Sequence, residues 1–579
     1  MRTVYKILTI FLFTTLILFA QPTDGKKDNR EVKQIPTLAE AFQKDSSALL
    51  KNIPQKKFFK RFYRNNNYEP LWISKNKLNK KKYSTLFSQI TNDLTLENDG
   101  LIFQQYQNLN KFLESNLSKE NIFRTEMKLS SLYYNFLKHV VYGEIEWKKF
   151  SYKLSSLKKS KIEASWLRSK PNFSISKLLV REDINQTIEY VTPKKYGYKA
   201  LLGALAQLKK EKEKGDWEKL PSFKKLSLGS TGEIVQQLRS RLKQSGDYID
   251  CKDENRTKII VKEENNETID SNSTEAIVHL NKDAIFGECL NSAVKHFQSI
   301  HGLMVDGIVG KGTQRALNIS IDKKIEKVLL NIDRIKWLPR DENERYIIVN
   351  IPEFMLHYIE NNTTKKKLRV IVGDPRHPTP IFSEKISFIV LNPYWKVPEG
   401  IVRREVVPAM IKNPNYLRKQ GLEVHQTWSE NSRIVDTSSL YWEDYLYGNQ
   451  KFPYRIMQPP GKRNALGKIK FKFPNRFSVY LHDTPTRYLF KKTVRAFSHG
   501  CVRLSQPKEL LETIATFNKN IDMKKATKTL RGKRKRQLNM PNKLRIYLIY
   551  LTAGVNEKGE VEFRNDIYGY DKYTKRRLN

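Results

Sequence analysis

Residues 479–485 read VYLHDTP, and residues 495–504 read RAFSHGCVRL. The apolar run Phe477–Leu481 predicts a β-strand that ends at His482, because short β-branched and aromatic runs favour strands. A second imidazole, His499, and a thiol, Cys501, follow a short way along the chain. Nucleophilic acyl transfer needs a thiolate, a base that holds its proton near neutral pH, and backbone donors for the oxyanion. These two stretches can supply all three.

Gly500 lets the backbone turn tightly beside Cys501. If the N–H groups of both residues point the same way, they form an oxyanion hole, in which one donor lowers the barrier by about 3 kcal/mol. Asp483 is not expected to hold the His482 ring, since adjacent strand residues face opposite sides. Zinc bound by His482, His499 and Cys501 is disfavoured, because the sequence offers no fourth ligand nearby and no Cys-x-x-Cys pair. The sequence predicts no metal and no cofactor.

The segment around these motifs, residues 344–579, reads as a mainly β domain. Short β-branched and aromatic runs at 346–351, 354–359, 368–373 and 386–391 predict its first strands. A stretch rich in Pro, Trp and Tyr at about 394–466 interrupts the domain and is too long for a structureless loop. Long insertions of this kind are often functional, so we predict that this one forms a lid.

Upstream of the β domain, residues 222–320 read as a three-helix module. Apolar residues at helical spacing predict the helices, and Gly302 is the expected cap after the second one. A polar stretch rich in Asn, Glu and Thr, at about 251–284, interrupts the module as a loop. Residues 36–220 read as a mostly helical region without a catalytic signature. A chain of 579 residues exceeds one ordinary core, so about three domains are expected.

The two motifs, with 18 residues between His482 and Cys501, resemble the signature of the L,D-transpeptidase catalytic domain. The stretch FQSIHGLMVDGIVGKGT at 297–313 likewise resembles the peptidoglycan-binding helical domain of wall enzymes, although a spacer that binds nothing is the alternative. The order of segments resembles the large Gram-negative members, which carry an N-terminal scaffold and a substrate-capping insertion. The predicted fold class is therefore multidomain α+β, with a helical scaffold, a three-helix module and a mainly β catalytic domain with a lid.

The resemblance implies a role for each motif residue. Cys501 is the nucleophile and His482 the general base, with a backbone carbonyl orienting its ring. Ser498 and His499 support the site beside Gly500. Arg503 shapes the site and can pair with a stem carboxylate, since a guanidinium binds carboxylates through two parallel hydrogen bonds.

The resemblance also implies the reaction. Cys501 attacks the diaminopimelate carbonyl of a donor tetrapeptide stem, expels D-alanine and forms a thioester. The amine of a second stem's diaminopimelate then attacks, which gives a three-to-three cross-link. Two alternatives use the same cysteine, namely an L,D-carboxypeptidase and a transferase that attaches another amine or a lipoprotein to the wall. A wall-binding protein with a degenerate site is the alternative from a different class.

The N-terminus bears on the compartment. Arg2 and Lys6 precede an apolar run from Ile7 to Ala20, which predicts a secretory signal peptide at residues 1–20 and a periplasmic protein. A retained anchor remains the alternative, although the run is shorter than the roughly 20 residues that span a bilayer. The formal net charge of +44 favours polyanionic partners. After export, the expected partners are peptidoglycan stem peptides, with inner-membrane association left open and nucleic acid disfavoured.

The chain has three cysteines, Cys251, Cys289 and Cys501, which excludes a disulfide-rich scaffold. Cys251 and Cys289 flank the polar stretch and can pair, which would leave Cys501 free. The alternative is that they remain two unlinked small hydrophobic residues, and the sequence favours neither.

Overall fold

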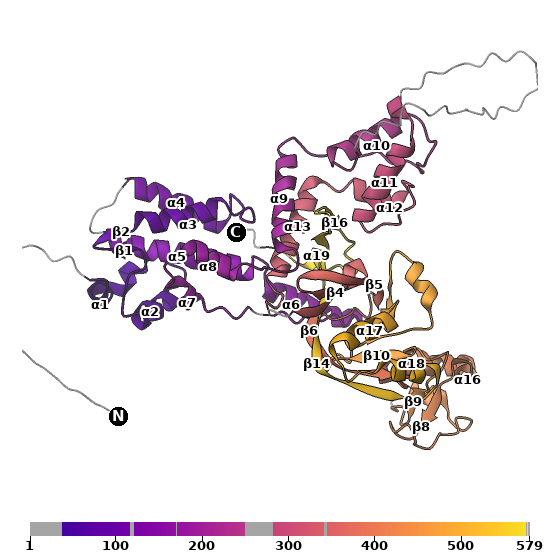
Figure 1. Ribbon diagram of the computed structural model, residues 1–579. Coiled ribbons are helices and arrows are strands. Elements are labelled where there is room, and N and C mark those ends of the chain that lie inside the picture. The colour runs from indigo at the N-terminus through magenta and orange to yellow at the C-terminus, as the bar shows by residue number, and fades with distance from the viewer. Residues whose placement is uncertain are drawn as a thin grey trace, which may run out of the picture.

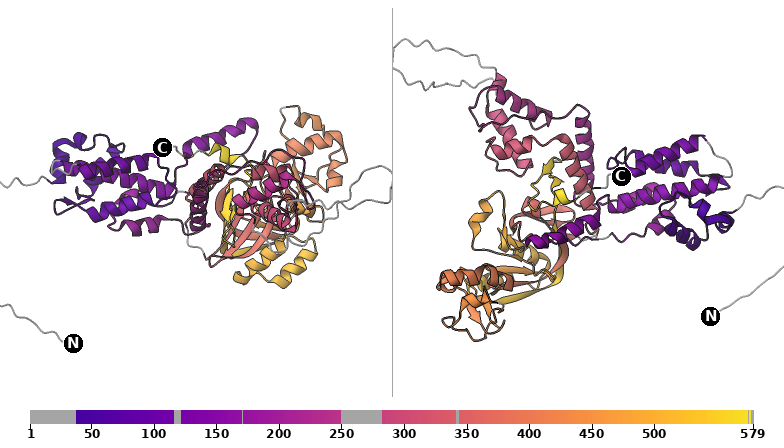
Figure 2. Two further views of the ribbon diagram at one scale, coloured as in Figure 1. Left: turned by 90° about the horizontal axis from the view of Figure 1, so that it is seen from above. Right: turned by 180° about the vertical axis from the view of Figure 1, so that it is seen from behind.

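The computed structural model describes residues 37–115, 121–169, 171–248, 282–340, 344–448, 450–574 and 576. The predicted signal peptide and Cys251, with most of the polar stretch, lie outside this part of the chain, so the Cys251–Cys289 pairing stays a prediction. No helix within the described part is long and apolar enough to cross a membrane. The N-terminal helices and the segment inserted at 394–466 lie at opposite ends of a central β domain (Figures 1 and 2).

The N-terminal region is a group of helices packed around α5 (Ile122–Tyr142). Leu132, Phe136 and Val140 are buried in its core, as their spacing predicts. The region also contains the helices α1 (Leu38–Leu49), α2 (Lys56–Asn65), α3 (Lys80–Thr91), α4 (Leu101–Ser115), α7 (Ile175–Leu179) and α8 (Ile184–Val191), and the short strands β1 (Ile73–Ser74) and β2 (Lys77–Leu78).

Two further helices of the predicted scaffold segment pack against the β domain and its connector. Phe150 of α6 (Trp147–Ser156) and Trp166, in the loop that follows, belong to the same apolar core as the central sheet. Helix α9 (Tyr198–Lys212) packs along the connector helix α13 (Ile321–Ile335). The scaffold is therefore joined to the catalytic region by buried apolar contacts as well as by the chain.

The predicted three-helix module consists of α10 (Glu233–Gln244), α11 (Glu288–Ile300) and α12 (Lys311–Leu317), with a short 3₁₀ turn at Lys282–Ala284. Val235, Leu238 and Phe297 are fully buried in its core. Gly302 follows α11 with φ +62°, the left-handed conformation expected of a residue that ends a helix.

The β domain is built on a nine-stranded sheet in the order β12-β5-β13-β11-β10-β6-β14-β3-β4, which closes because β4 also pairs with β5. Its strands are β3 (Arg345–Asn350), β4 (Met355–Glu360), β5 (Thr363–Gly373), β6 (Phe382–Leu391), β10 (Ile469–Lys472), β11 (Leu481–His482), β12 (Ala496–Ser498), β13 (Val502–Leu504) and β14 (Arg536–Ile549). Around it lie α17 (Pro507–Phe517), α18 (Met523–Arg531), α19 (Tyr570–Tyr573) and the hairpin of β15 (Ala553–Val555) and β16 (Val561–Phe563). Ile469 and Phe471 of β10 face the apolar core, so the alternating residues Lys470 and Lys472 lie on the opposite face.

The segment inserted at 394–466 is a folded unit with its own apolar core, which includes Val397, Val407, Trp442 and Ile456. Its three-stranded sheet pairs β7 (Trp395–Lys396) with β9 (Arg455–Gln458) and β9 with β8 (Glu423–His425). Its helical part runs through α14 (Glu399–Ile401), the π-helical turn Val402–Val406, α15 (Val407–Lys412), α16 (Tyr416–Gln420) and a 3₁₀ turn at Trp442–Tyr445. A core of this kind gives the segment a defined shape that an extended loop lacks.

Candidate active site

The candidate site lies on one face of three neighbouring strands, β10, β11 and β13. His482 lies on β11, where it is paired with Lys470 of β10 on one side and with Arg503 of β13 on the other. Tyr480 and Cys501, which directly precede β11 and β13, join this group, because the Tyr480 ring lies 5.5 Å from that of His482 and its side chain hydrogen-bonds with Cys501. The register of these strands therefore brings together residues that are far apart in the sequence.

The His482 ring is held by a backbone carbonyl. The side chain is only 4% exposed, and its Nδ1–H donates to the carbonyl oxygen of Asp483 at 2.6 Å. This bond requires the proton on Nδ1, which leaves Nε2 as a proton acceptor. Burial, followed by the Arg503 charge, lowers the pKa of His482 to about 3, so the ring is neutral at neutral pH. The neutral ring can act as a base.

The carboxylate of Asp483 points away from the His482 ring, as the alternation of strand residues predicts. It accepts a hydrogen bond from the backbone N–H of Lys468 at 2.9 Å and one from Arg487 at 2.8 Å. Gly467, with φ +58°, makes room for it, because a Cβ there would come within 2.4 Å of the carboxylate. Asp483 thus contributes its carbonyl to the site, while its carboxylate binds the segments at Lys468 and Arg487.

Cys501 is a free, half-buried thiol. Burial raises the pKa of Cys501, although Tyr480, Lys470 and Arg503 stabilise its thiolate form and oppose that shift. Its Sγ lies 3.8 Å from the carbonyl oxygen of Ser478. The resting site therefore combines a neutral thiol with a neutral imidazole.

The turn before Cys501 is fixed by hydrogen bonds. Gly500 adopts φ +99°, which side-chain-bearing residues rarely adopt, and its carbonyl accepts a bond from the Thr379 hydroxyl at 2.9 Å. The hydroxyl of the buried Ser498 donates to the carbonyl oxygen of Cys501 at 2.5 Å. Both hydrogen bonds hold the backbone that carries the thiol, and the support role expected for Gly500 and Ser498 stays a prediction.

Arg503, Lys470 and Tyr480 surround the thiol and imidazole. One Arg503 Nη donates to the Thr486 hydroxyl at 3.2 Å, while its Nε is buried without a hydrogen-bond partner. The ammonium of Lys470 lies 3.7 Å from the centroid of the Tyr480 ring. Burial, followed by the nearby Cys501, raises the pKa of Tyr480 well above its usual value, so its phenol stays protonated.

Sequence reasoning missed Lys470 and Tyr480. The available signal was the alternation in Ile469–Lys472, where two lysines occupy one face of a short strand.

Comparisons with known proteins agree with this geometry. Residues 344–530 match the sequence model of the L,D-transpeptidase catalytic domain, residues 57–205 that of a scaffold domain, and residues 231–317 that of the "Putative peptidoglycan binding domain". Residues 344–530 are an L,D-transpeptidase catalytic domain. The expected family and the multidomain α+β fold are thereby confirmed.

A Haemophilus influenzae protein named "Putative L,D-transpeptidase" is 33% identical to the chain over 247 residues. The match covers 43% of this chain and 48% of the relative, so the chain spans about half the length of the curated relative.

Two solved structures were also matched. An L,D-transpeptidase from Xylanimonas cellulosilytica is 17% identical, with 57% of this chain and 99% of that chain covered and a TM-score of 0.17. An L,D-transpeptidase from Stackebrandtia nassauensis is 12% identical, with 57% and 96% covered and a TM-score of 0.19. TM-scores this low do not support any conclusion about the fold of this chain.

In the L,D-transpeptidase domain, His499 contacts the inserted segment. Its Nε2 lies 2.6 Å from the Glu405 carboxylate, in the π-helical turn Val402–Val406. The hydrogen bond with Glu405 raises the pKa of His499, and the His499 ring lies 4.6 Å from that of His377. Sequence reasoning placed His499 as support beside Cys501. The partner Glu405 was not predictable, because it lies almost 100 residues away in a segment whose fold the sequence did not reveal.

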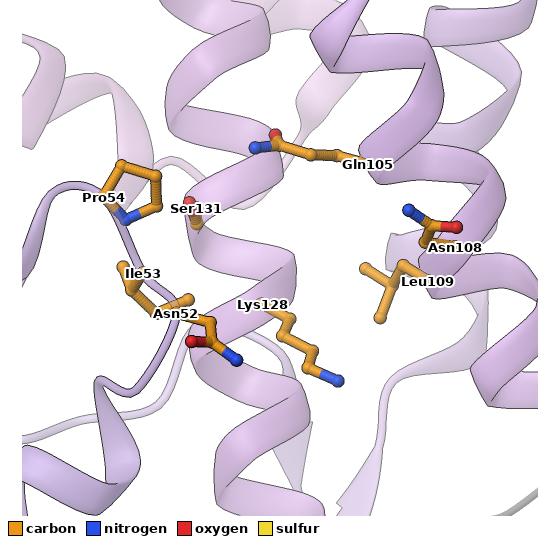
Figure 3. A pocket seen from close by; sticks show the side chains of 8 residues that line it. All are labelled: Asn52, Ile53, Pro54, Gln105, Asn108, Leu109, Lys128 and Ser131. Carbon is orange, nitrogen blue, oxygen red and sulfur yellow. The ribbon is translucent and has the colours of Figure 1, made fainter.

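Pockets away from Cys501 include one of about 700 Å³ lined by Tyr190, Lys194 and Arg340 among others, whose lining contains no cysteine and no histidine. A cavity of about 160 Å³ lies between the loop after α1 and helices α4 and α5, lined by Asn52, Gln105, Lys128 and Ser131 among others (Figure 3). Its lining contains no cysteine and no histidine. Within the residues that the structure describes, no three His, Cys, Asp or Glu side chains converge as a metal-binding group.

Proposed function

We propose that the protein is a peptidoglycan L,D-transpeptidase that forms three-to-three cross-links between diaminopimelate residues through a thioester on Cys501. The observation that carries this proposal is the oriented, neutral His482, whose ring lies 5.5 Å from that of Tyr480, the hydrogen-bond partner of the free thiol of Cys501. The match of residues 231–317 to a peptidoglycan-binding model supports the wall as the substrate.

Activation begins from the neutral pair. As Sγ of Cys501 attacks the third-residue carbonyl of the donor stem, Nε2 of His482 takes the thiol proton, while the Asp483 carbonyl keeps the ring in the productive tautomer. Lys470 and Arg503 lower the cost of the negative charge that develops on sulfur, because each stabilises the thiolate form.

Acylation then follows through a tetrahedral intermediate. The new S–C bond moves an electron pair onto the carbonyl oxygen, which accepts hydrogen bonds from the backbone N–H groups beside Gly500 and Cys501. Collapse of this oxyanion breaks the C–N bond, and the His482 imidazolium returns its proton to the departing amine of D-alanine. The thioester remains on Cys501.

The second half-reaction restores the enzyme. The side-chain amine of an acceptor diaminopimelate attacks the thioester, His482 accepts its proton, and the C–S bond breaks to return a thiol. One peptide bond is broken and one is formed, so the transfer needs no nucleotide.

The inserted segment acts as a lid that keeps water from the thioester. Its contact with the catalytic motif is the Glu405–His499 ion pair, which adjoins the turn that carries Cys501. Exclusion of water favours the amine as the acceptor and disfavours simple hydrolysis. The enzyme works outside the cytoplasm, where its substrate lies, and the signal peptide at residues 1–20 serves its export.

The test is mass spectrometry of disaccharide-tetrapeptides incubated with the protein and with its Cys501→Ala variant. Cross-linked dimers that form only with Cys501 are the expected result. Tripeptides without dimers would identify a carboxypeptidase, and unchanged substrate would favour a wall-binding role. Retention of both variants on isolated peptidoglycan provides the control for wall binding.

A further inference from the structure

Lys470 has no carboxylate partner among the residues that the structure describes. It lies on β10 directly across from His482, and no carboxylate among the described residues forms an ion pair with it. Its ammonium makes no hydrogen bond within that part of the chain and lies over the Tyr480 ring, 3.7 Å from the centroid. A strand surface needs no charged residue here, so the position calls for a chemical reason.

The surroundings make a positive charge at this point costly. Burial, followed by the like charge of Lys472, lowers the pKa of Lys470 to about 8, and Lys396 and Lys535 add to the effect. Arg503, on the other side of His482, also lacks a carboxylate partner within the described residues and donates to the Thr486 hydroxyl. The catalytic face thus carries three cations, Lys470, Lys472 and Arg503, and no carboxylate among the described residues forms an ion pair with them.

The donor stem can supply the missing anion. In the proposed reaction, the terminal D-alanine carries a free carboxylate one residue from the carbonyl that Cys501 attacks, and successive Cα atoms are about 3.8 Å apart. Lys470 is paired with His482 across β10 and β11, and its ammonium lies over the ring of Tyr480, the residue that contacts Cys501, so it lies on the side of the sheet where the donor must bind. The flexible side chain of a lysine adapts to such a carboxylate as a point charge.

We infer that Lys470 is a specificity-determining residue whose ammonium group binds the terminal carboxylate of the donor stem. The inference rests on the proposed function, because it takes the donor to be a stem that ends in D-alanine. Lys470 is favoured over Arg503 for this role because one Arg503 amine is engaged by Thr486, whereas the Lys470 ammonium is not hydrogen-bonded.

Such a contact would couple donor selection to catalysis. The positive charges of Arg503 and Lys470 both lower the pKa of His482. A bound carboxylate offsets this charge and makes His482 a stronger base once the correct donor is in place. A stem longer by one residue presents a neutral peptide group at the same point, so Lys470 would select tetrapeptide over pentapeptide donors.

The experiment compares Lys470→Met with the unmodified protein on two donors, a disaccharide-tetrapeptide that ends in D-alanine and the same donor ending in D-alaninamide. The unmodified protein is expected to prefer the carboxylate donor by about tenfold to hundredfold in kcat/KM, a range that fits a close charge pair. Lys470→Met should abolish that preference, and Lys470→Arg should retain most of it. Lys472→Met, on the same strand and face, is the matched control and should keep the preference.

A binding measurement on the full chain carrying Cys501→Ala makes the result independent of turnover. Calorimetric titration with the two donors should show tighter binding of the carboxylate form, and adding Lys470→Met should remove the difference. A preference that survives Lys470→Met in both measurements would overturn the inference. Absence of turnover with every donor, together with a binding preference that depends on Lys470, would instead count against the proposed reaction alone.

Discussion

Two buried histidines in two regions of the molecule have pKa values that are shifted in opposite directions, down for His482 and up for His139. His482 in the catalytic domain is 4% exposed and His139 in the helical scaffold is 1% exposed. His139 contacts Glu144 through Nδ1 at 2.7 Å, and Nε2 lies 2.7 Å from the Thr95 hydroxyl and 3.3 Å from Asp93. Burial and Lys336 lower its pKa, but the two carboxylates outweigh them, so the pKa of His139 is raised.

The comparison teaches that the sign of neighbouring charges, and not burial alone, decides the state of each ring. Carboxylates favour the protonated form of His139 beside an ionic network that includes Asp333, Lys336 and Arg576. The network joins the scaffold to α13 and to the C-terminal segment, because Asp333 also accepts the backbone N–H of Glu144 at 3.1 Å. Burial and the neighbouring cations keep His482 neutral, which suits a base, although its hydrogen bond to the Asp483 carbonyl favours the protonated form.

The largest expected effect is on the catalytic side. Replacing His482 with Gln keeps a polar side chain of similar size but removes the base, so kcat/KM should fall by about 10²–10⁴-fold. The thermal midpoint should change much less than the activity. Release of D-alanine from a donor tetrapeptide measures the rate, and a loss smaller than tenfold would remove His482 from the role of base.

A substitution in the ionic network of the scaffold should instead lower the free energy of unfolding. Asp333→Asn leaves the buried charges of Lys336 and Arg576 without their carboxylate, which should cost about 3–5 kcal/mol. The calorimetric midpoint should then fall by at least about 6 °C, with kcat of the folded enzyme retained. Asp322→Asn in the same helix is the matched control, because the Asp322–Lys212 pair is exposed and contributes little. Equal midpoints for the two variants would contradict the stabilising role of the network.

The proposed catalytic pair, His482 and Cys501, could be selected from the sequence because both residues stand in short local motifs. The glycine turn before Cys501 is a local feature that is visible in a short run of residues. The strand predicted over Phe477–Leu481 is shorter than expected, since it covers only Leu481–His482 and Ser478 has a left-handed φ of 55°. An orienting backbone carbonyl was implied by the family resemblance, and local alternation excluded only the Asp483 carboxylate; the structure shows that the carbonyl is that of Asp483. The helical region, the three-helix module and the β domain were also visible as changes in apolar periodicity.

The remaining parts of the site depend on contacts that no short run encodes. Lys470 meets His482 only through the register of β10 against β11. Glu405 meets His499 only through the fold of the inserted segment, whose core could not be assigned from its composition. The scaffold network likewise joins Asp93 to Asp333 and Arg576, residues separated by most of the chain. Tertiary packing therefore determines the Lys470–His482 pairing, the Glu405–His499 ion pair and the scaffold network.

A smaller effect is expected where the inserted segment meets the catalytic motif. Glu405→Gln removes the charge that pairs with His499, a partly exposed ion pair, so the ratio of cross-linked dimer to hydrolysed tripeptide should fall by about two- to fivefold. Mass spectrometry of the products measures the ratio directly. Glu399→Gln, in the exposed helix α14 of the same segment, should leave it unchanged. A ratio that Glu405→Gln does not alter would show that this ion pair does not control access of water.

The smallest expected effect is a nearly flat response of activity to mild acid. A base is active when unprotonated, and a pKa lowered to about 3 means that His482 takes up a proton only as the pH falls far below 5. Between pH 7 and pH 5, kcat/KM should therefore change by less than about twofold, in contrast to the fall that an ordinary histidine near 6.5 would give. Arg503→Gln removes one of the cations that lower this pKa, so its acid limb should move to higher pH. An acid limb near pH 6.5 in the unmodified enzyme would mean that the charges around His482 do not set its state, and the contrast with His139 would lose its physical basis.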